Sequence, residues 1–201
     1  MKINLLRKIL YLKLLFIPTS SEILRIFLSL LAIPFVLGSC ELKQKQMTEI
    51  TLSELTITEI HTAYKEGTYT SRNLVQAYLD RIAEHNNTLN AITIINPEAL
   101  SVAQSLDEEY KRTGKLRPLH GIPLIVKDNI NTAGLPTTAG SLALQDYTPE
   151  EDAFIIGKLV EAGAIVLAKS NMAEWAFSPM HSESSTAGTT RNPYNPEYVP
   201  A

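Results

Sequence analysis

The segment Leu119-His-Gly-Ile-Pro-Leu-Ile-Val-Lys-Asp-Asn-Ile130 decides the fold of this 201-residue chain. Four of the five residues from Ile122 to Val126 are apolar, which predicts a short buried strand that ends in charge. Because Lys127 follows these apolar residues, we expect its stem to enter the core. Burial would disfavour the ammonium form, as a lysine base requires. From periodicity alone, a strand-end lysine that only extends its amine into water is the favoured interpretation. Asp128 is expected to be an ordinary strand-end carboxylate or a helix cap.

Helices and strands alternate on both sides of this segment. Helical spacing predicts a helix through Ile57 and Tyr64, and a second one capped by Thr70. Four further elements are expected: a strand at 91–95, a helix opened by Asn96-Pro97 and ending near Gly114, a helix capped by Asp152 and closed by Gly163, and a strand at 165–168. This order predicts an α/β fold with a largely parallel or mixed central sheet covered by helices.

Composition narrows the possible functions. The chain is 45% hydrophobic and 19% charged, so it can bury a sizeable core. A net charge of −3 argues against nucleic-acid binding, which usually requires a basic surface. The histidines show no metal-ligand spacing, so structural roles are expected for all four and no metal site is predicted. They are His61, His85, His120 and His181.

The first forty residues have the pattern of an export signal. Five of the 18 basic residues but one of the 21 acidic residues lie in residues 1–39, which leaves 13 basic and 20 acidic residues, a net charge of −7, in the remainder. An apolar run at 26–38 is too short for an ordinary spanning helix. Its last two residues begin the block Leu37-Gly38-Ser39-Cys40. This end resembles a bacterial lipobox, in which Cys40 receives the lipid.

We therefore expect a lipoprotein signal peptide at 1–39, a polar tether at 40–50 and a folded domain at 51–201. The protein would be exported and anchored by lipid to a bacterial membrane, on its periplasmic or outer face. An uncleaved N-terminal anchor with an incidental cysteine is the alternative. The start site stays open, because a second apolar run at 9–17 precedes the first.

Five blocks in the same order resemble the amidase-signature family. They are Leu119–Ile130, Thr137-Thr-Ala-Gly-Ser-Leu-Ala-Leu144, Asp152-Ala-Phe, Ala162–Met172 with Glu174-Trp175, and Thr190-Arg-Asn-Pro-Tyr-Asn-Pro196. The resemblance extends over about 150 residues from roughly Glu49 onward, and it leans toward the peptide-amidase-like branch. It implies the N-terminal portion of the amidase-signature fold.

The resemblance also implies a mechanism. Lys127 matches the family's catalytic lysine, which acts with two serines to hydrolyse carboxamide or peptide amide bonds without metal or organic cofactor. The two serines belong to a Gly-Ser-rich loop and the segment after it, expected immediately after the block that ends at Pro196. Ser184 and Ser185 lie upstream of this point and are expected in a surface or substrate-side loop. We therefore expect the 201-residue form to be an inactive fragment that carries only the lysine.

Two other functions remain open from the sequence. One is a non-catalytic, lipid-anchored binding or scaffold module derived from an amidase, and the other is a split enzyme that a second chain completes. Export argues against the family members that act on aminoacyl-tRNA in the cytosol. The amide substrate and the oligomeric state cannot be derived from these residues.

Overall fold

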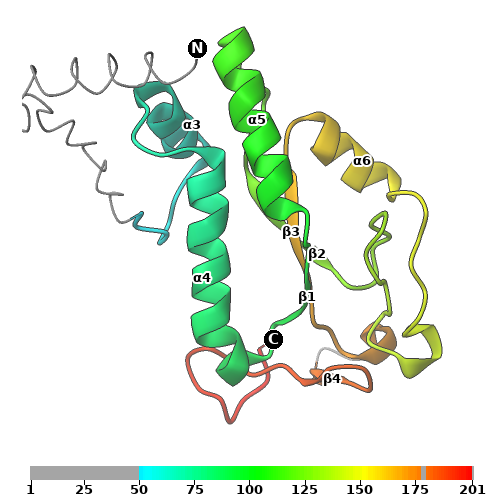
Figure 1. Cartoon of the computed structure of the whole chain (residues 1–201). Helices are drawn as coiled ribbons and strands as arrows, with labels where there is room; N and C mark the ends of the chain where they lie inside the picture. The colour runs from blue at the N-terminus through cyan, green and yellow to red at the C-terminus, as the bar shows by residue number, and fades with distance from the viewer. Residues whose placement is uncertain (1–49, 178–179, 201) are drawn as a thin grey trace, which may run out of the picture. The chain divides into compact units, whose positions relative to one another are not determined.

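A computed structural model describes residues 50–177 and 180–200 of the chain, and its domain forms a mixed α/β fold (Figure 1). The helices are α3 (Ile57–Glu66), α4 (Ser71–Leu89), α5 (Ala99–Thr113) and α6 (Phe154–Glu161), with 3-10 turns η2 (Leu142–Leu144) and η3 (Glu174–Ala176). The strands are β1 (Ile92–Ile95), β2 (Pro123–Lys127), β3 (Ile165–Ser170), β4 (Glu183–Ser184) and β5 (Gly188–Thr189). The predicted α/β class is confirmed.

The main sheet has three strands in the order β1-β3-β2, and a separate hairpin joins β4 and β5. The central strand β3 runs antiparallel to β1 and parallel to β2, so the predicted mixed sheet is confirmed. The register between β2 and β3 shifts between Leu124 and Ile125. After this shift Val126 lies opposite Lys169, which places a charged residue of the central strand beside the end of β2.

The sheet is covered on both faces. Val75 of α4 and Leu106 of α5 pack against Ile165 and Leu167 of β3 on one face. On the other face, Ile156 of α6 packs with hydrophobic residues of β2, β3 and the segment after β2, namely Val126, Val166 and Leu135. Figure 1 shows these three layers, with α4 and α5 on one side of the strands and α6 on the other. The loop after β2 therefore shares its face of the sheet with α6.

Local capping explains where the first helices begin and end. Thr56 and Thr70 each form a capping box with the residue three positions later, at the starts of α3 and α4. Gly67 and Gly114 take left-handed conformations after α3 and α5, which ends these helices where the sequence predicts. The helix predicted after Thr70 is confirmed, and it extends to Leu89.

Two predicted caps are wrong. The helix α5 begins at Ala99 after Glu98, and Asn96 instead accepts a hydrogen bond from the Glu98 backbone N–H at 3.0 Å. Asp152 does not cap α6, whose N-cap is Ala153 without a side-chain bond. The Asp152 carboxylate accepts from the backbone N–H of Ala133 at 2.7 Å, so it stabilises the loop after β2.

Gly163 allows the chain to turn closely from α6 into β3. Its φ is +102°, and a Cβ at this position would lie 2.8 Å from the Cα of His120. The Gly121 N–H donates to the Gly163 carbonyl at 2.9 Å across this contact. A side chain is excluded both by the backbone angle and by the neighbouring backbone, and the contact joins the start of β2 to the start of β3.

No helix among residues 50–177 and 180–200 is long and apolar enough to cross a bilayer. The predicted signal peptide, its lipid-accepting Cys40 and nearly all of the tether lie outside the described residues. These predictions are therefore untested by the structure.

Tyr64 is a buried tyrosine of α3 that contributes to the pH dependence of stability. Its hydroxyl donates to the Gly121 carbonyl at 2.9 Å, and burial raises the pKa of Tyr64 well above its usual range. Because the unfolded chain loses this proton first as pH rises, the tyrosine's contribution to stability is complete below about pH 10 and declines above it. We expect Tyr64→Phe to lower the free energy of unfolding by about 1 kcal/mol at neutral pH and to weaken the decline above about pH 10.

Urea unfolding at neutral and alkaline pH measures both effects. Tyr194→Phe is the matched control, because the Tyr194 side chain is almost fully exposed. An unchanged alkaline decline in Tyr64→Phe would contradict the assignment.

Candidate functional site

The candidate site is centred on Lys127, the last residue of β2. Lys127 is exposed, and its amine has no hydrogen-bond or ion-pair partner among residues 50–177 and 180–200. The expectation that its stem enters the core is wrong. Side chains alternate along a strand, so Lys127 lies on the same face of β2 as Ile125, which is 53% exposed. The structure thus presents a free primary amine at the carboxyl end of a rigid strand.

Asp128 follows Lys127 and is buried, with 1% of its surface exposed. Its carboxylate accepts hydrogen bonds from the Thr138 backbone N–H at 3.2 Å, from the Gly140 N–H at 3.2 Å and from the Thr138 hydroxyl. A carboxylate that is held by three donors is neither an ordinary strand-end charge nor a helix cap. Asp128 instead ties the end of β2 to the segment 138–140.

Polar contacts continue from this segment to the β4–β5 hairpin. The Thr138 hydroxyl lies 3.3 Å from the Thr186 hydroxyl, which lies 2.8 Å from that of Ser184. Ser184 also donates to the Gly140 carbonyl at 3.0 Å. Ser184 is buried in β4 and Ser185 is exposed, so only Ser185 lies at the surface, and a substrate-side role for both serines stays a prediction. The end of β2 and the hairpin are connected by hydrogen bonds.

A pocket of about 520 Å³ lies beside the hairpin. Its lining residues are Ala173, Glu174, Trp175, Phe177, His181, Glu183, Ser184 and Ser185. Hydrogen bonds from Ser141 first, and then from Ser185, lower the pKa of the Glu174 carboxyl, so this group favours its anionic form. The pocket therefore combines exposed aromatic side chains with two carboxylates and two serine hydroxyls.

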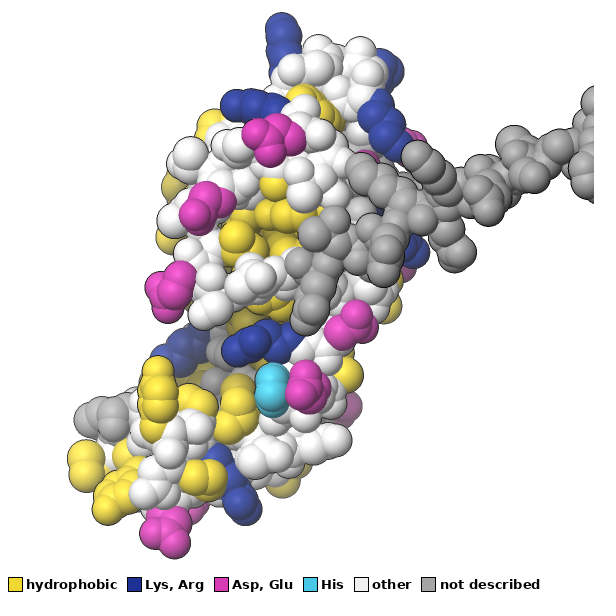
Figure 2. All heavy atoms as spheres, turned by 90° about the vertical axis from the view of Figure 1, so that its left-hand side faces the viewer, with side chains coloured by type: hydrophobic (Ala, Val, Ile, Leu, Met, Phe, Trp, Pro, Cys, Tyr) yellow, Lys and Arg dark blue, Asp and Glu magenta, His cyan; other side chains and the backbone are white. Residues whose placement is uncertain are grey.

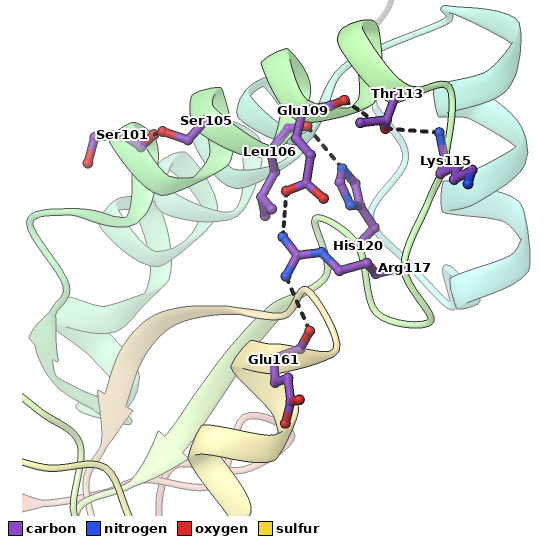
Figure 3. A network of polar contacts seen from close by, with 9 residues as sticks. All are labelled: Ser101, Ser105, Leu106, Glu109, Thr113, Lys115, Arg117, His120 and Glu161. Atoms are coloured by element: carbon purple, nitrogen blue, oxygen red, sulfur yellow. Dashed lines mark hydrogen bonds and ion pairs between the residues drawn. The ribbon is translucent and has the colours of Figure 1, made fainter.

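The segment before β2 is fixed by a separate polar network (Figure 3). Arg117 donates to the Glu109 carboxylate of α5 at 2.7 Å and to the Glu161 carbonyl at the end of α6 at 3.2 Å. His120 is fully buried, and its Nε2 lies 3.0 Å from the Leu106 carbonyl. Figure 3 shows Arg117 reaching between the two helices while His120 points toward α5. This network connects the start of β2 to helices on both faces of the sheet.

Comparison with known proteins identifies the family. Residues 73–201 match the model of the Amidase family. The chain belongs to the amidase family. It is 42% identical, with a TM-score of 0.69, to the native peptide amidase from Stenotrophomonas maltophilia, over 74% of this chain and 32% of that one. An amidase family protein from Bacillus anthracis is 39% identical with a TM-score of 0.66, over 72% of this chain and 30% of that one.

A curated amidase-family relative is a glutamyl-tRNA(Gln) amidotransferase subunit from Lawsonia intracellularis. It is 44% identical over 147 residues, which cover 73% of this chain and 30% of the relative. The chain thus spans about 30% of the length of the curated relatives that it matches. Both amide-hydrolysing and amidotransferase members therefore resemble this domain.

The amidase-family domain also exposes hydrophobic side chains in the segment after β5. Figure 2 shows hydrophobic side chains gathered toward the lower end of the face that carries α4, where Figure 1 places the segment after β5. Tyr194 is 97% exposed and Tyr198 is 67% exposed in this segment. Exposed apolar groups of this kind are typical of surfaces that contact further protein or a ligand.

Lys169 is a site-adjacent residue that sequence reasoning missed. It is the largest side chain that is almost fully buried in the described part of this amidase-family domain, and its amine contacts the loop after β2. The sequence shows only a lysine at the end of the apolar run 165–168. Its position directly after four apolar residues was the available signal, as it was for Lys127.

Proposed function

We propose that the protein of which residues 50–201 form a part hydrolyses carboxamide or peptide amide bonds, with Lys127 as its general base. The observation that supports this most strongly is the unpartnered Lys127 amine at the end of β2, in a chain of the amidase family. The hairpin pocket lies within the same hydrogen-bonded unit as Asp128 and provides room for a substrate.

In the proposed reaction the Lys127 amine nitrogen takes a proton through a bridging serine from a second, nucleophilic serine. The nucleophile attacks the amide carbonyl carbon and forms an acyl-enzyme, and the C–N bond breaks as ammonia or an amine leaves with a proton. Water then hydrolyses the ester bond and regenerates the serine. We infer from the resemblance to amidase-signature enzymes that both serines belong to a Gly-Ser-rich loop expected after Pro196 and the segment that follows it, and the proposed steps use no cofactor.

The test is a chimera in which residues 50–201 replace the matching part of the Stenotrophomonas maltophilia peptide amidase. We expect the chimera to release ammonia from a C-terminally amidated peptide, because the replacement is 42% identical to the sequence that it displaces. The native peptide amidase is the positive control. The isolated 201-residue chain is the negative control, and we expect it to show no turnover. A folded but inactive chimera, or turnover by the isolated chain, would refute this form of the proposal.

We also propose that the protein is exported and lipid-anchored through Cys40, the only cysteine of the chain. In bacteria that express the chain, labelled palmitate should enter the wild type and be absent from Cys40→Ala, because no other thiol is available. Ser39→Ala keeps a small residue before the cysteine and should label like the wild type. Equal labelling of the wild type and Cys40→Ala would exclude a lipid anchor at this position.

A further inference from the structure

Lys169 lies on the central strand with its side chain fully buried beneath the loop that follows β2. Its amine Nζ is 2.6 Å from the Ile130 carbonyl oxygen, 2.9 Å from the Thr137 hydroxyl oxygen and 3.4 Å from the Thr132 hydroxyl oxygen. All three partners belong to one loop, and none of them is a carboxylate. A buried lysine of this kind requires an explanation, because removing an ammonium from water is costly.

The directions of these hydrogen bonds indicate the protonation state of Lys169. The Thr132 hydroxyl donates to the Ile130 carbonyl at 3.3 Å, and the Thr137 hydroxyl donates to the Leu135 carbonyl at 3.4 Å. Both hydroxyl oxygens therefore face Lys169 as acceptors, and the Ile130 carbonyl can only accept. Three acceptors match the three N–H groups of an ammonium, whereas a neutral amine would offer two donors and a lone pair.

Two electrostatic effects act on the pKa of Lys169 in opposite directions. Burial lowers the pKa of Lys169, while the nearby negative charge of Asp128 raises it. The three acceptors compensate for part of the lost hydration. Lys169 and Asp128 also hold different parts of one loop, because Asp128 accepts from Thr138 and Gly140 while Lys169 donates to residues 130–137.

We propose that Lys169 is a positioning residue: its buried ammonium holds the loop 130–137 against β3 and thereby fixes the end of β2 that presents Lys127. The Lys169 contacts begin at Ile130, whose backbone N–H donates to the Lys127 carbonyl at 3.0 Å. Lys169 thus acts on Lys127 through the backbone of one tight turn. The consequence for catalysis rests on the proposed function, whereas the clamp on the loop does not.

Hydrogen–deuterium exchange of the 201-residue chain in mild detergent tests the clamp without requiring catalysis. Thr137→Val keeps the shape of the side chain and removes the acceptor, whereas Thr137→Ser keeps the hydroxyl. We expect Thr137→Val to accelerate exchange of peptides covering 129–140 by about fivefold, with α4 and α5 unchanged, because one buried hydrogen bond contributes about 1 kcal/mol. Thr137→Ser should restore protection close to that of the wild type.

Thr137→Val also removes the bond to the Leu135 carbonyl, so Lys169→Met completes a double-mutant cycle. Lys169→Met should accelerate exchange in 129–140 by more than Thr137→Val does. Adding Thr137→Val to Lys169→Met should change the exchange rate by less than about twofold, since the Lys169–Thr137 hydrogen bond is already lost. Equal effects of Thr137→Val and Thr137→Ser, additive effects in the cycle, or acceleration spread evenly over the chain would overturn the proposal. If Lys169→Met does not fold, the comparison of Thr137→Val with Thr137→Ser tests the clamp by itself. An inactive chimera would refute only the proposed function and not the clamp.

Discussion

Replacing Lys127 by methionine should reduce amide hydrolysis by the chimera by about a thousandfold or more, with little change in stability. Removing one member of a catalytic unit of this kind eliminates most of the rate enhancement. The Lys127 amine has no partner among residues 50–177 and 180–200, so its loss removes no hydrogen bond from the described fold. Catalysis and folding are therefore separable at this position. The measurement is kcat for ammonia release, together with a urea unfolding curve.

The matched control is Lys115→Met, because Lys115 is also an exposed lysine and lies in the segment before β2. Its activity should stay within about twofold of the parent chimera, since surface substitutions away from a site have small effects. A Lys127→Met chimera that retains most of its kcat would show that another group is the base. A large loss of stability instead would show that Lys127 supports the fold.

Asp128→Asn should lower the free energy of unfolding of the 201-residue chain by about 2–3 kcal/mol. The Asp128 carboxylate accepts from three donors, two backbone N–H groups and the Thr138 hydroxyl. An amide has one oxygen, and its NH2 group would point toward donors that then lack an acceptor. Buried donors without a partner cost more than an average hydrogen bond contributes. The midpoint and slope of urea unfolding, followed by circular dichroism, measure the change.

Asp146→Asn is the control, because Asp146 is an exposed carboxylate of the same loop region. Its unfolding midpoint should equal that of the wild type within error. If Asp128→Asn is as stable as this control, the three contacts to Asp128 contribute nothing to the fold. The segment 138–140 would then need another support.

Most of the architecture could be predicted from local sequence. Thr70 and Gly114 mark helix ends because capping depends on residues only a few positions apart. The strands at 92–95 and 165–170 coincide with apolar runs in the sequence, which a packed sheet requires. The wrong cap at Asp152 shows the limit of this reasoning, because its partner Ala133 lies 19 residues away.

The candidate site could be predicted only in part, because it too depends on contacts between residues that are far apart in the sequence. The sequence pattern for Lys127 and Lys169 is similar, a lysine after an apolar run, yet one is exposed and the other is fully buried. The register shift between β2 and β3 after Leu124 helps to decide which face each lysine occupies, and it depends on pairing between segments that are distant in the sequence. The family resemblance identified Lys127 as a candidate, but the apolar run before Lys169 did not show that this lysine is buried, and no local signal identified the three contacts of Asp128.

The central position of β3 has a consequence for synthesis of the protein. Both β1 and β2 pair with β3, although β3 is the last of these three strands to leave the ribosome. At ordinary rates of translation, the strand that begins at Ile92 waits for several seconds before residue 170 is made. During this interval α4 and α5 can form from local contacts, while the earlier strands have no partner and expose aggregation-prone edges. The three-stranded sheet can therefore pair only after β3 has left the ribosome.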